Sequence, residues 1–218
     1  QPPASLVDKC VATWKRTDGD LREIVRTIVT SPEFYAPSAR RSKIKSPFEY
    51  AVSSVRALGG TYQAAAAERA VAKPQRAIAL LKPPKGGGYL DLNISTIVGQ
   101  VGTMGEPLFQ YQAPTGYPED SQKWVSSGAL ISRLNFALAL TSGKIADVAL
   151  DRAGGATGDP AHQIDRIAAQ VLHAPISPAT RATLLKQVQL VSTDSGQQAN
   201  SAGRIEALLL GSPEFQRR

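Results

Sequence analysis

The sequence is poor in the residues that most often build metal-binding or redox sites. Among 218 residues it has one cysteine, Cys10, and two histidines, His162 and His173. A single cysteine excludes a disulfide within the chain. On one helix the two histidines would lie about 16 Å apart, which is too far for both to bind one metal ion. We therefore predict no metal site and no cofactor.

Long apolar runs and catalytic signatures are missing too. No stretch approaches the roughly 18 consecutive apolar residues that a membrane-spanning helix needs. The sequence has neither the Gly-x-Ser-x-Gly turn of serine hydrolases nor the glycine fingerprint of dinucleotide-binding folds. The glycines at 86–88 lack the Lys-Ser/Thr pair of a phosphate loop. These absences predict that the chain has no membrane-spanning helix. They also mean that the sequence contains no motif that would indicate a catalytic activity.

Aromatic residues make up only 6% of the chain, and many of them gather near one stretch, residues 105–140. Pro114, Gly116 and Pro118 predict an irregular loop in its first half. A long helix is expected to begin after Ser121, and Gly143 is expected to end it. Apolar residues at spacings of three and four predict one buried stripe on this helix: Trp124, Leu130, Ile131, Leu134, Ala137 and Leu138.

Helical periodicity recurs along the rest of the chain. The expected helices span residues 4–16, 21–29, 46–58, 62–81 in two pieces, 90–104, 161–173, 178–191 and 199–210. This pattern predicts an all-α fold, an irregular multi-helix bundle with long loops, in a single domain over residues 1–218. The Pro- and Gly-rich residues 82–90 are expected to form a flexible loop or linker.

A four-residue motif occurs twice, as Ser31-Pro32-Glu33-Phe34 and as the 212–215 segment with the same sequence. Ser is a good N-cap, Pro suits the first helical position, and Glu in the first turn favours the helix dipole. Each motif is therefore predicted to end one helix and start another turn. The alternative hypothesis makes Glu33 and Glu214 a pair of catalytic carboxylates.

Four pieces of the sequence carry a family resemblance. They are TDGDLREIVRTIVTSPEFYAP, KSPFEYAVSSVRALG, the run from Gly105 to Leu140, and the closing IEALLLGSPEFQRR. In this order they resemble DUF1800, a large bacterial family of unknown function. The resemblance implies that the chain is the C-terminal portion of a larger protein, because the family's N-terminal His/Arg-rich helical motif has no match here.

The resemblance also implies a periplasmic or extracellular location. Family members are commonly encoded beside a secreted protein that resembles the alkaline-phosphatase superfamily. The expected partners are therefore the N-terminal region of the same protein and a phosphatase-like protein. No activity is established for the family, so the resemblance assigns no catalytic residue.

The candidate ligand site is the loop and helix of residues 105–140. Aromatic faces beside carboxylates and amides suit carbohydrate or peptide recognition, because they combine stacking with hydrogen bonding. The alternative is structural, in which the aromatic residues fix the loop and Arg133 pairs with Glu106 or Asp120. The candidate residues are Glu106, Gln110, Tyr111, Tyr117, Asp120, Trp124, Arg133 and Asn135.

The net charge of +7 is concentrated in one segment. Residues 36–88 hold ten Lys or Arg and two Glu, so the segment carries +8 and the rest of the chain −1. Such a segment attracts polyanions, although a solvated face gives the same pattern. The candidate polyanion-binding residues are Arg40, Arg41, Lys43, Lys45, Arg69, Lys73, Arg76, Lys82 and Lys85.

These observations lead to three hypotheses of function. The first is a binding or assembly module, which predicts an exposed apolar patch when the chain stands alone. The second is a hydrolase on an acidic polymer that uses Glu106 or Asp120 as acid or base. The third is a nucleic-acid or polyanion binder whose affinity falls steeply with salt. Whether the protein is an enzyme stays open at this point.

Overall fold

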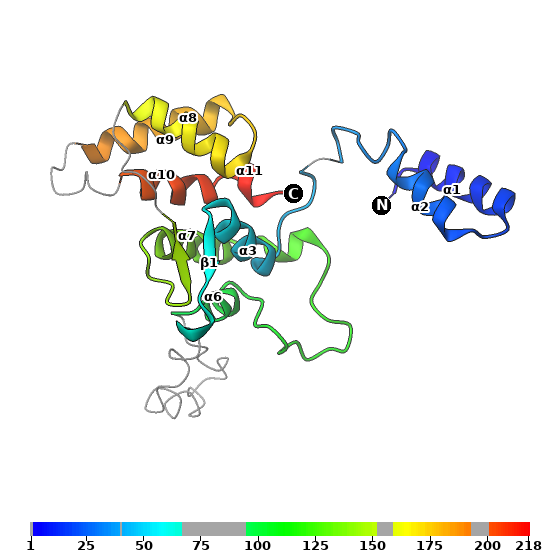
Figure 1. Ribbon diagram of the computed structural model, residues 1–218, viewed down its shortest axis with the longest axis horizontal. Coiled ribbons are helices and arrows are strands. Elements are labelled where there is room, and N and C mark those ends of the chain that lie inside the picture. Colours follow the sequence, from blue (N-terminus) through cyan, green and yellow to red (C-terminus); the bar gives the residue numbers. More distant parts are fainter. Residues whose placement is uncertain (1, 40, 67–94, 152–158, 193–200) are drawn as a thin grey trace. The chain divides into compact units, whose positions relative to one another are not determined.

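The computed structural model describes residues 2–39, 41–66, 95–151, 159–192 and 201–218. Apart from one two-stranded sheet, their regular structure is helical (Figure 1), which confirms the all-α prediction. The residues form two compact units, 1–43 with Arg218, and 44–217. The prediction of one domain did not include this division. The loop predicted at residues 82–90 lies outside the described part of the chain.

The first unit is a helical hairpin. Its helices are α1 (Ala4–Thr17) and α2 (Leu21–Val29), at the blue end of the colour scale in Figure 1. Asp18 and Gly19 take left-handed backbone conformations in the turn, with φ of 52° and 83°. Asp20 then caps α2 by accepting a hydrogen bond from the Arg22 N–H. The predicted helix, turn and cap are therefore all present.

Little apolar surface is buried within this hairpin. The hydroxyls of Thr13 and Thr27 are 3.1 Å apart where the two helices face each other. Thr13 and Ser31 are the buried side chains of the unit's described residues, and no apolar side chain of the unit is among the buried ones. The predicted apolar stripes of α1 and α2 are consequently present but incompletely covered.

The second unit contains a continuous apolar core. Its helices are α3 (Pro47–Ala57), α6 (Ile97–Thr103), α7 (Ser127–Thr141), α8 (Pro160–Leu172), α9 (Pro178–Ser192), α10 (Ser201–Leu210) and α11 (Pro213–Gln216). Helix α10 lies between α7 and α8, and α9 packs on α8 (Figure 1). Tyr50, Phe136, Ile164 and Ile205 each have 0% exposed surface at the centre of the core.

A short antiparallel sheet was not predicted from the sequence. Strand β1 (Gly60–Tyr62) pairs with β2 (Val148–Leu150), with Gly60 opposite Leu150 and Tyr62 opposite Val148. The helix expected to begin at Tyr62 is therefore wrong at its start, and most of the 62–81 prediction lies outside the described residues. A three-residue strand gives almost no periodic signal, and its partner is far away in the sequence.

Ser-Pro pairs mark helix starts as expected. Ser46 forms a capping box with Glu49 at α3, and Ser212 accepts from the Phe215 N–H at α11. Ser177 accepts a hydrogen bond from the Thr180 N–H at the start of α9. Ser31 makes the same bond to the Phe34 N–H, although the residues after it form a turn rather than a helix.

The helix predicted after Ser121 is interrupted. Residues Ser121–Trp124 form a 3-10 turn, η1, capped by Asp120. Val125 and Ser126 are extended, and the Ser126 hydroxyl caps α7 by accepting from the Ala129 N–H. The second cap stops η1 and α7 from joining. The helix expected over residues 90–104 is likewise shorter, because Thr96 caps α6.

Candidate functional site

Three aromatic side chains of the loop before α7 pack on one another. The ring centroids of Tyr111 and Tyr117 are 4.5 Å apart, and those of Tyr117 and Trp124 are 5.9 Å apart. The Tyr117 hydroxyl donates to the Pro107 carbonyl at 2.7 Å, and the Trp124 indole N–H donates to the Pro118 carbonyl at 3.1 Å. These contacts fix the loop, and Tyr111, 43% exposed, keeps a face toward solvent.

The two candidate carboxylates lie at helix starts. Glu106 accepts the Phe48 N–H at 2.7 Å, in the first turn of α3. Asp120 accepts the Gln122 N–H at 3.0 Å, at the start of η1. Both positions satisfy backbone donors that a helix leaves unpaired at its N-terminal end. Each carboxylate therefore has a structural partner, which is local for Asp120 and 58 residues away in the sequence for Glu106.

Arg133 lies in the core with 1% of its surface exposed. Its Nη1 donates to Gln216 Oε1 at 2.6 Å and its Nη2 donates to the Lys45 carbonyl at 2.7 Å. The guanidinium carbon is 5.2 Å from the centroid of the Tyr50 ring. Burial lowers the pKa of Arg133, which the nearby Tyr50 and Glu106 partly oppose. Thus Arg133 joins three segments rather than facing the aromatic loop.

The two remaining candidate residues, Gln110 and Asn135, lie in different elements. Gln110 is half-buried in the loop, where its N–H donates to the Pro107 carbonyl at 3.2 Å. Asn135 is exposed on α7. The structure brings Tyr111, Tyr117 and Trp124 together, and it gives Arg133 partners outside that aromatic cluster.

Helix α7 exposes the apolar side that the sequence predicted to be buried. Its exposed apolar side chains, which we call the α7 face, are Leu130, Ile131, Leu134 and Leu138, with 46%, 61%, 37% and 41% of their surface exposed. Trp124 and Ala137 of the predicted stripe are buried, whereas these four are not. Arg133, Phe136 and Leu140 face the core instead. The prediction was wrong because α7 is apolar on both sides.

The α7 face carries no charge. Arg133 is the one charged residue between Ser127 and Thr141, and it is buried. A helix with apolar side chains on two sides is normally covered on both of them. The α7 face is therefore suited to contact another apolar surface.

A family model described as "Protein of unknown function (DUF1800)" matches residues 1–217. The chain belongs to the DUF1800 family. No curated protein and no solved structure matches it. The family description states no activity, so it gives no residue of this DUF1800 chain a role.

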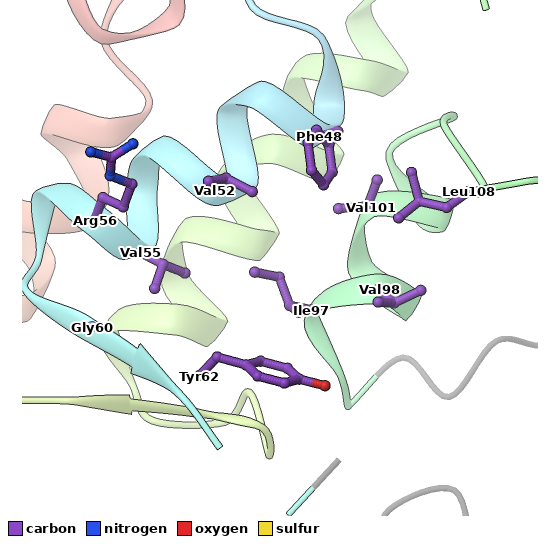
Figure 2. Close-up of a pocket in the computed structure, with 10 residues that line it drawn as sticks. All are labelled: Phe48, Val52, Val55, Arg56, Gly60, Tyr62, Ile97, Val98, Val101 and Leu108. Atoms are coloured by element: carbon purple, nitrogen blue, oxygen red, sulfur yellow. The ribbon is translucent and has the colours of Figure 1, made fainter. Parts of the chain in front are cut away.

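The DUF1800 chain also has an apolar groove of about 340 Å³ between α3, β1 and α6 (Figure 2). Val52 and Val55 project into it from α3, and Ile97 and Val98 project from α6. Tyr62 of β1 crosses one edge. The volume is at the lower end of the ~300–1,000 Å³ typical of ligand pockets. Its lining offers apolar contact and no carboxylate or histidine for acid–base chemistry.

Only part of the basic segment is described in this DUF1800 structure. Arg41, Lys43 and Lys45 are half-buried. The Lys45 ammonium lies 3.7 Å from the centroid of the Phe215 ring, a cation–π contact. The other six candidate cations, Arg40, Arg69, Lys73, Arg76, Lys82 and Lys85, lie outside the described residues.

The two repeated motifs position their glutamates alike. Glu33 accepts hydrogen bonds from Ser5 Oγ at 2.9 Å and Lys9 Nζ at 2.7 Å, and the Lys9 contact is the main reason that its pKa falls to about 2. Glu214 accepts from Thr180 Oγ1 at 2.7 Å and from the Ser177 N–H at 3.3 Å. Each glutamate joins its motif to a neighbouring helix of its own unit.

The described ranges contain neither a cluster of metal ligands nor a membrane-spanning helix. Within them, no three His, Cys, Asp or Glu side chains come together in a way that would hold a metal ion. No helix there is both long enough and apolar enough to cross a bilayer.

Proposed function

We propose that this DUF1800 chain is a binding or assembly module that joins a partner through the α7 face. The observation that carries the proposal is the exposure of four large aliphatic side chains on a helix without surface charge. Soluble monomers rarely expose contiguous apolar patches of this kind, and such patches are typical of protein–protein contacts. The proposal needs no catalytic group.

The α7 face has a rigid support beneath it. Arg133, Phe136 and Leu140 fix the opposite side of the helix in the core, with 0–1% of their surface exposed. Leu134 additionally lies close to Gly211 at the end of α10, where a built Cβ would be 3.5 Å from Leu134 Cδ1. A preorganised face loses little entropy on binding, which favours specific association.

The proposed partners are the N-terminal region of the same protein and a phosphatase-like secreted protein, in a periplasmic or extracellular setting. Both partners and the location rest on the family resemblance. The acid–base role of Glu106 or Asp120 and the polyanion role of the basic segment stay predictions, because no contact of the described residues favours either one.

The test is recovery of partners from native-source cells by the tagged protein and by two variants. Ile131→Glu places a charge on the most exposed residue of the α7 face, and we expect it to abolish co-purification of either partner in a fixed ratio. Ala182→Glu adds the same charge to an exposed position of α9 and should leave recovery unchanged.

Binding of a dye that reports apolar surface, measured on the purified chain, completes the experiment. The wild type should bind it and Ile131→Glu should bind less. A wild-type chain that purifies alone and binds no dye would refute the assembly proposal. Loss of partners in both variants would show that added charge, not the α7 face, is responsible.

A further inference from the structure

We infer that the apolar groove between α3, β1 and α6 binds a single-chain aliphatic carboxylate, with its hydrocarbon chain along the groove and its carboxylate at Arg56. The groove lies entirely within the second unit and shares no residue with the α7 face. Three properties of the lining identify this ligand: the small volume, the shortage of polar groups and the position of one positive charge.

Large apolar side chains of the groove are open to solvent. Phe48, Tyr62 and Val98 are 45%, 58% and 41% exposed, and all three line the groove. Val55 and Val101 of the same lining are buried. Figure 2 shows these side chains projecting from α3, β1 and α6 around one hollow. Because the walls belong to elements of one core, the groove is formed before a ligand binds, which favours affinity.

The groove is too small to hold a helix of a partner protein. With side chains, a helix is about 10 Å across, so each ångström of its length takes up roughly 80 Å³. A volume of about 340 Å³ would contain only ~4 Å of helix, which is less than one turn. The same volume holds roughly ten methylene groups at about 30 Å³ each, the space that one water molecule takes in the liquid. A narrow chain therefore fits the groove.

The lining side chains offer little to a peptide or a sugar. Only the Tyr62 hydroxyl and the Arg56 guanidinium among them can form hydrogen bonds. A peptide carries an N–H or C=O group at every residue and a sugar carries several hydroxyls, and burying such groups without partners is unfavourable. An aliphatic chain has no polar group to satisfy, and each methylene that it buries strengthens binding.

Charge identifies the head group of the ligand. Arg56 lies in the last turn of α3 and Phe48 in the first, about 12 Å apart along the helix (Figure 2). Arg56 is exposed, and within the described residues no hydrogen bond or ion pair holds its guanidinium. A carboxylate at one end of an aliphatic chain can pair with this guanidinium while the chain extends toward Phe48.

The experiment is calorimetric titration of the full 218-residue chain with hexanoate, octanoate, decanoate and dodecanoate. Each added methylene should tighten binding about three- to fourfold while the groove is being filled. The gain should end at roughly ten carbons, when the available volume is occupied. A wild-type chain that binds none of the four acids overturns the inference. So does an affinity that does not depend on chain length.

Three variants test the position of the hydrocarbon chain and of the carboxylate. Val98→Trp fills the groove from α6 and should weaken decanoate binding at least about tenfold. Val11→Trp makes the same change at a similarly exposed helical valine outside the groove, 46% against 41%, and should leave binding unchanged. Arg56→Gln should weaken decanoate binding about three- to fivefold, as for an exposed ion pair, and leave the binding of decanol unchanged.

Methyl NMR of the wild type locates the ligand without relying on a folded variant. Decanoate should shift the methyl signals of Val52, Val55 and Val98, which line the groove. The methyl signals of Leu130 and Leu138 on the α7 face should stay where they are. Shifts on the α7 face in place of the groove would overturn the inference.

This outcome is separable from that of the assembly proposal. Ile131→Glu should remove the partners and leave decanoate binding at the wild-type level. Val98→Trp should do the reverse.

Discussion

At the scale of the residue, the second Ser-Pro-Glu-Phe motif shows how one carboxylate can stabilise a helix junction. Partial burial alone would raise the pKa of Glu214, but hydrogen bonds from Thr180 and Ser177 outweigh it and lower the pKa from 4.5 to about 2. The folded protein therefore binds this proton less readily than the unfolded chain. The stabilisation is fully present above pH 4.5 and is lost as the pH falls toward 2.

We predict that Glu214→Gln removes this part of the acid sensitivity. The wild type should lose about 1–2 kcal/mol more unfolding free energy between pH 5 and pH 3 than the variant does. Urea unfolding at several pH values measures the difference. Thr180→Val removes one donor, so it should raise the pKa of Glu214, which NMR titration of the carboxyl carbon reports directly. An unchanged titration would show that Thr180 is not the cause.

At the scale of the element, the β1–β2 sheet depends on the absence of one side chain. A Cβ at Gly60 would lie 2.7 Å from Val55 Cγ1, 2.9 Å from Leu150 Cδ2 and 3.0 Å from the Val55 carbonyl oxygen. Two of these distances, to side-chain methyl groups, are under 3.0 Å and the third is to backbone, so an added Cβ would force α3, β1 or the Val55 and Leu150 side chains to shift. Gly60 thus allows the strand to approach the helix closely.

Gly60→Ala is expected to destabilise the second unit by about 1–3 kcal/mol, because it overpacks the junction of α3, β1 and β2. Thermal or urea unfolding followed by circular dichroism measures the loss. Gly128→Ala is the matched control, since a Cβ there meets only Ser126 Oγ at 4.0 Å and α7 gains a better helix former. Equal stability of Gly60→Ala and wild type would mean that the close approach is not needed.

At the scale of the whole molecule, Arg133 connects parts of the chain that are distant in sequence. It joins α7 to the segment before α3 through the Lys45 carbonyl, and to the end of α11 through Gln216. Lys45 lies near the start of the second unit, and Gln216 lies near its end. One buried guanidinium therefore helps to close the core of that unit.

Arg133→Met should lower the free energy of unfolding by about 2–4 kcal/mol, because buried acceptors at Gln216 and Lys45 lose their donor. Denaturant unfolding of the second unit, followed by Trp124 fluorescence, measures this change. Arg166→Met at an exposed position of α8 should stay within about 0.5 kcal/mol of wild type. If both variants are equally stable, Arg133 has no closing role.

The candidate site was predictable only in part. The aromatic cluster of Tyr111, Tyr117 and Trp124 follows from a loop rich in Pro and Gly that needs side chains to fix it. The pairing of Arg133 with Gln216 did not follow, because the two residues are far apart in the sequence. The α7 face was missed for a different reason: an amphipathic pattern identifies an apolar side, but α7 has two.

The sequence by itself determined those helix starts that carry a local cap. Ser46, Asp20 and Ser212 cap helices through bonds to residues two or three positions away, so local spacing is sufficient to predict them. The tertiary structure decided which side of α7 is buried and which strand pairs with β1. Both depend on contacts between distant segments, and the free energy of those contacts is set by packing rather than by local sequence.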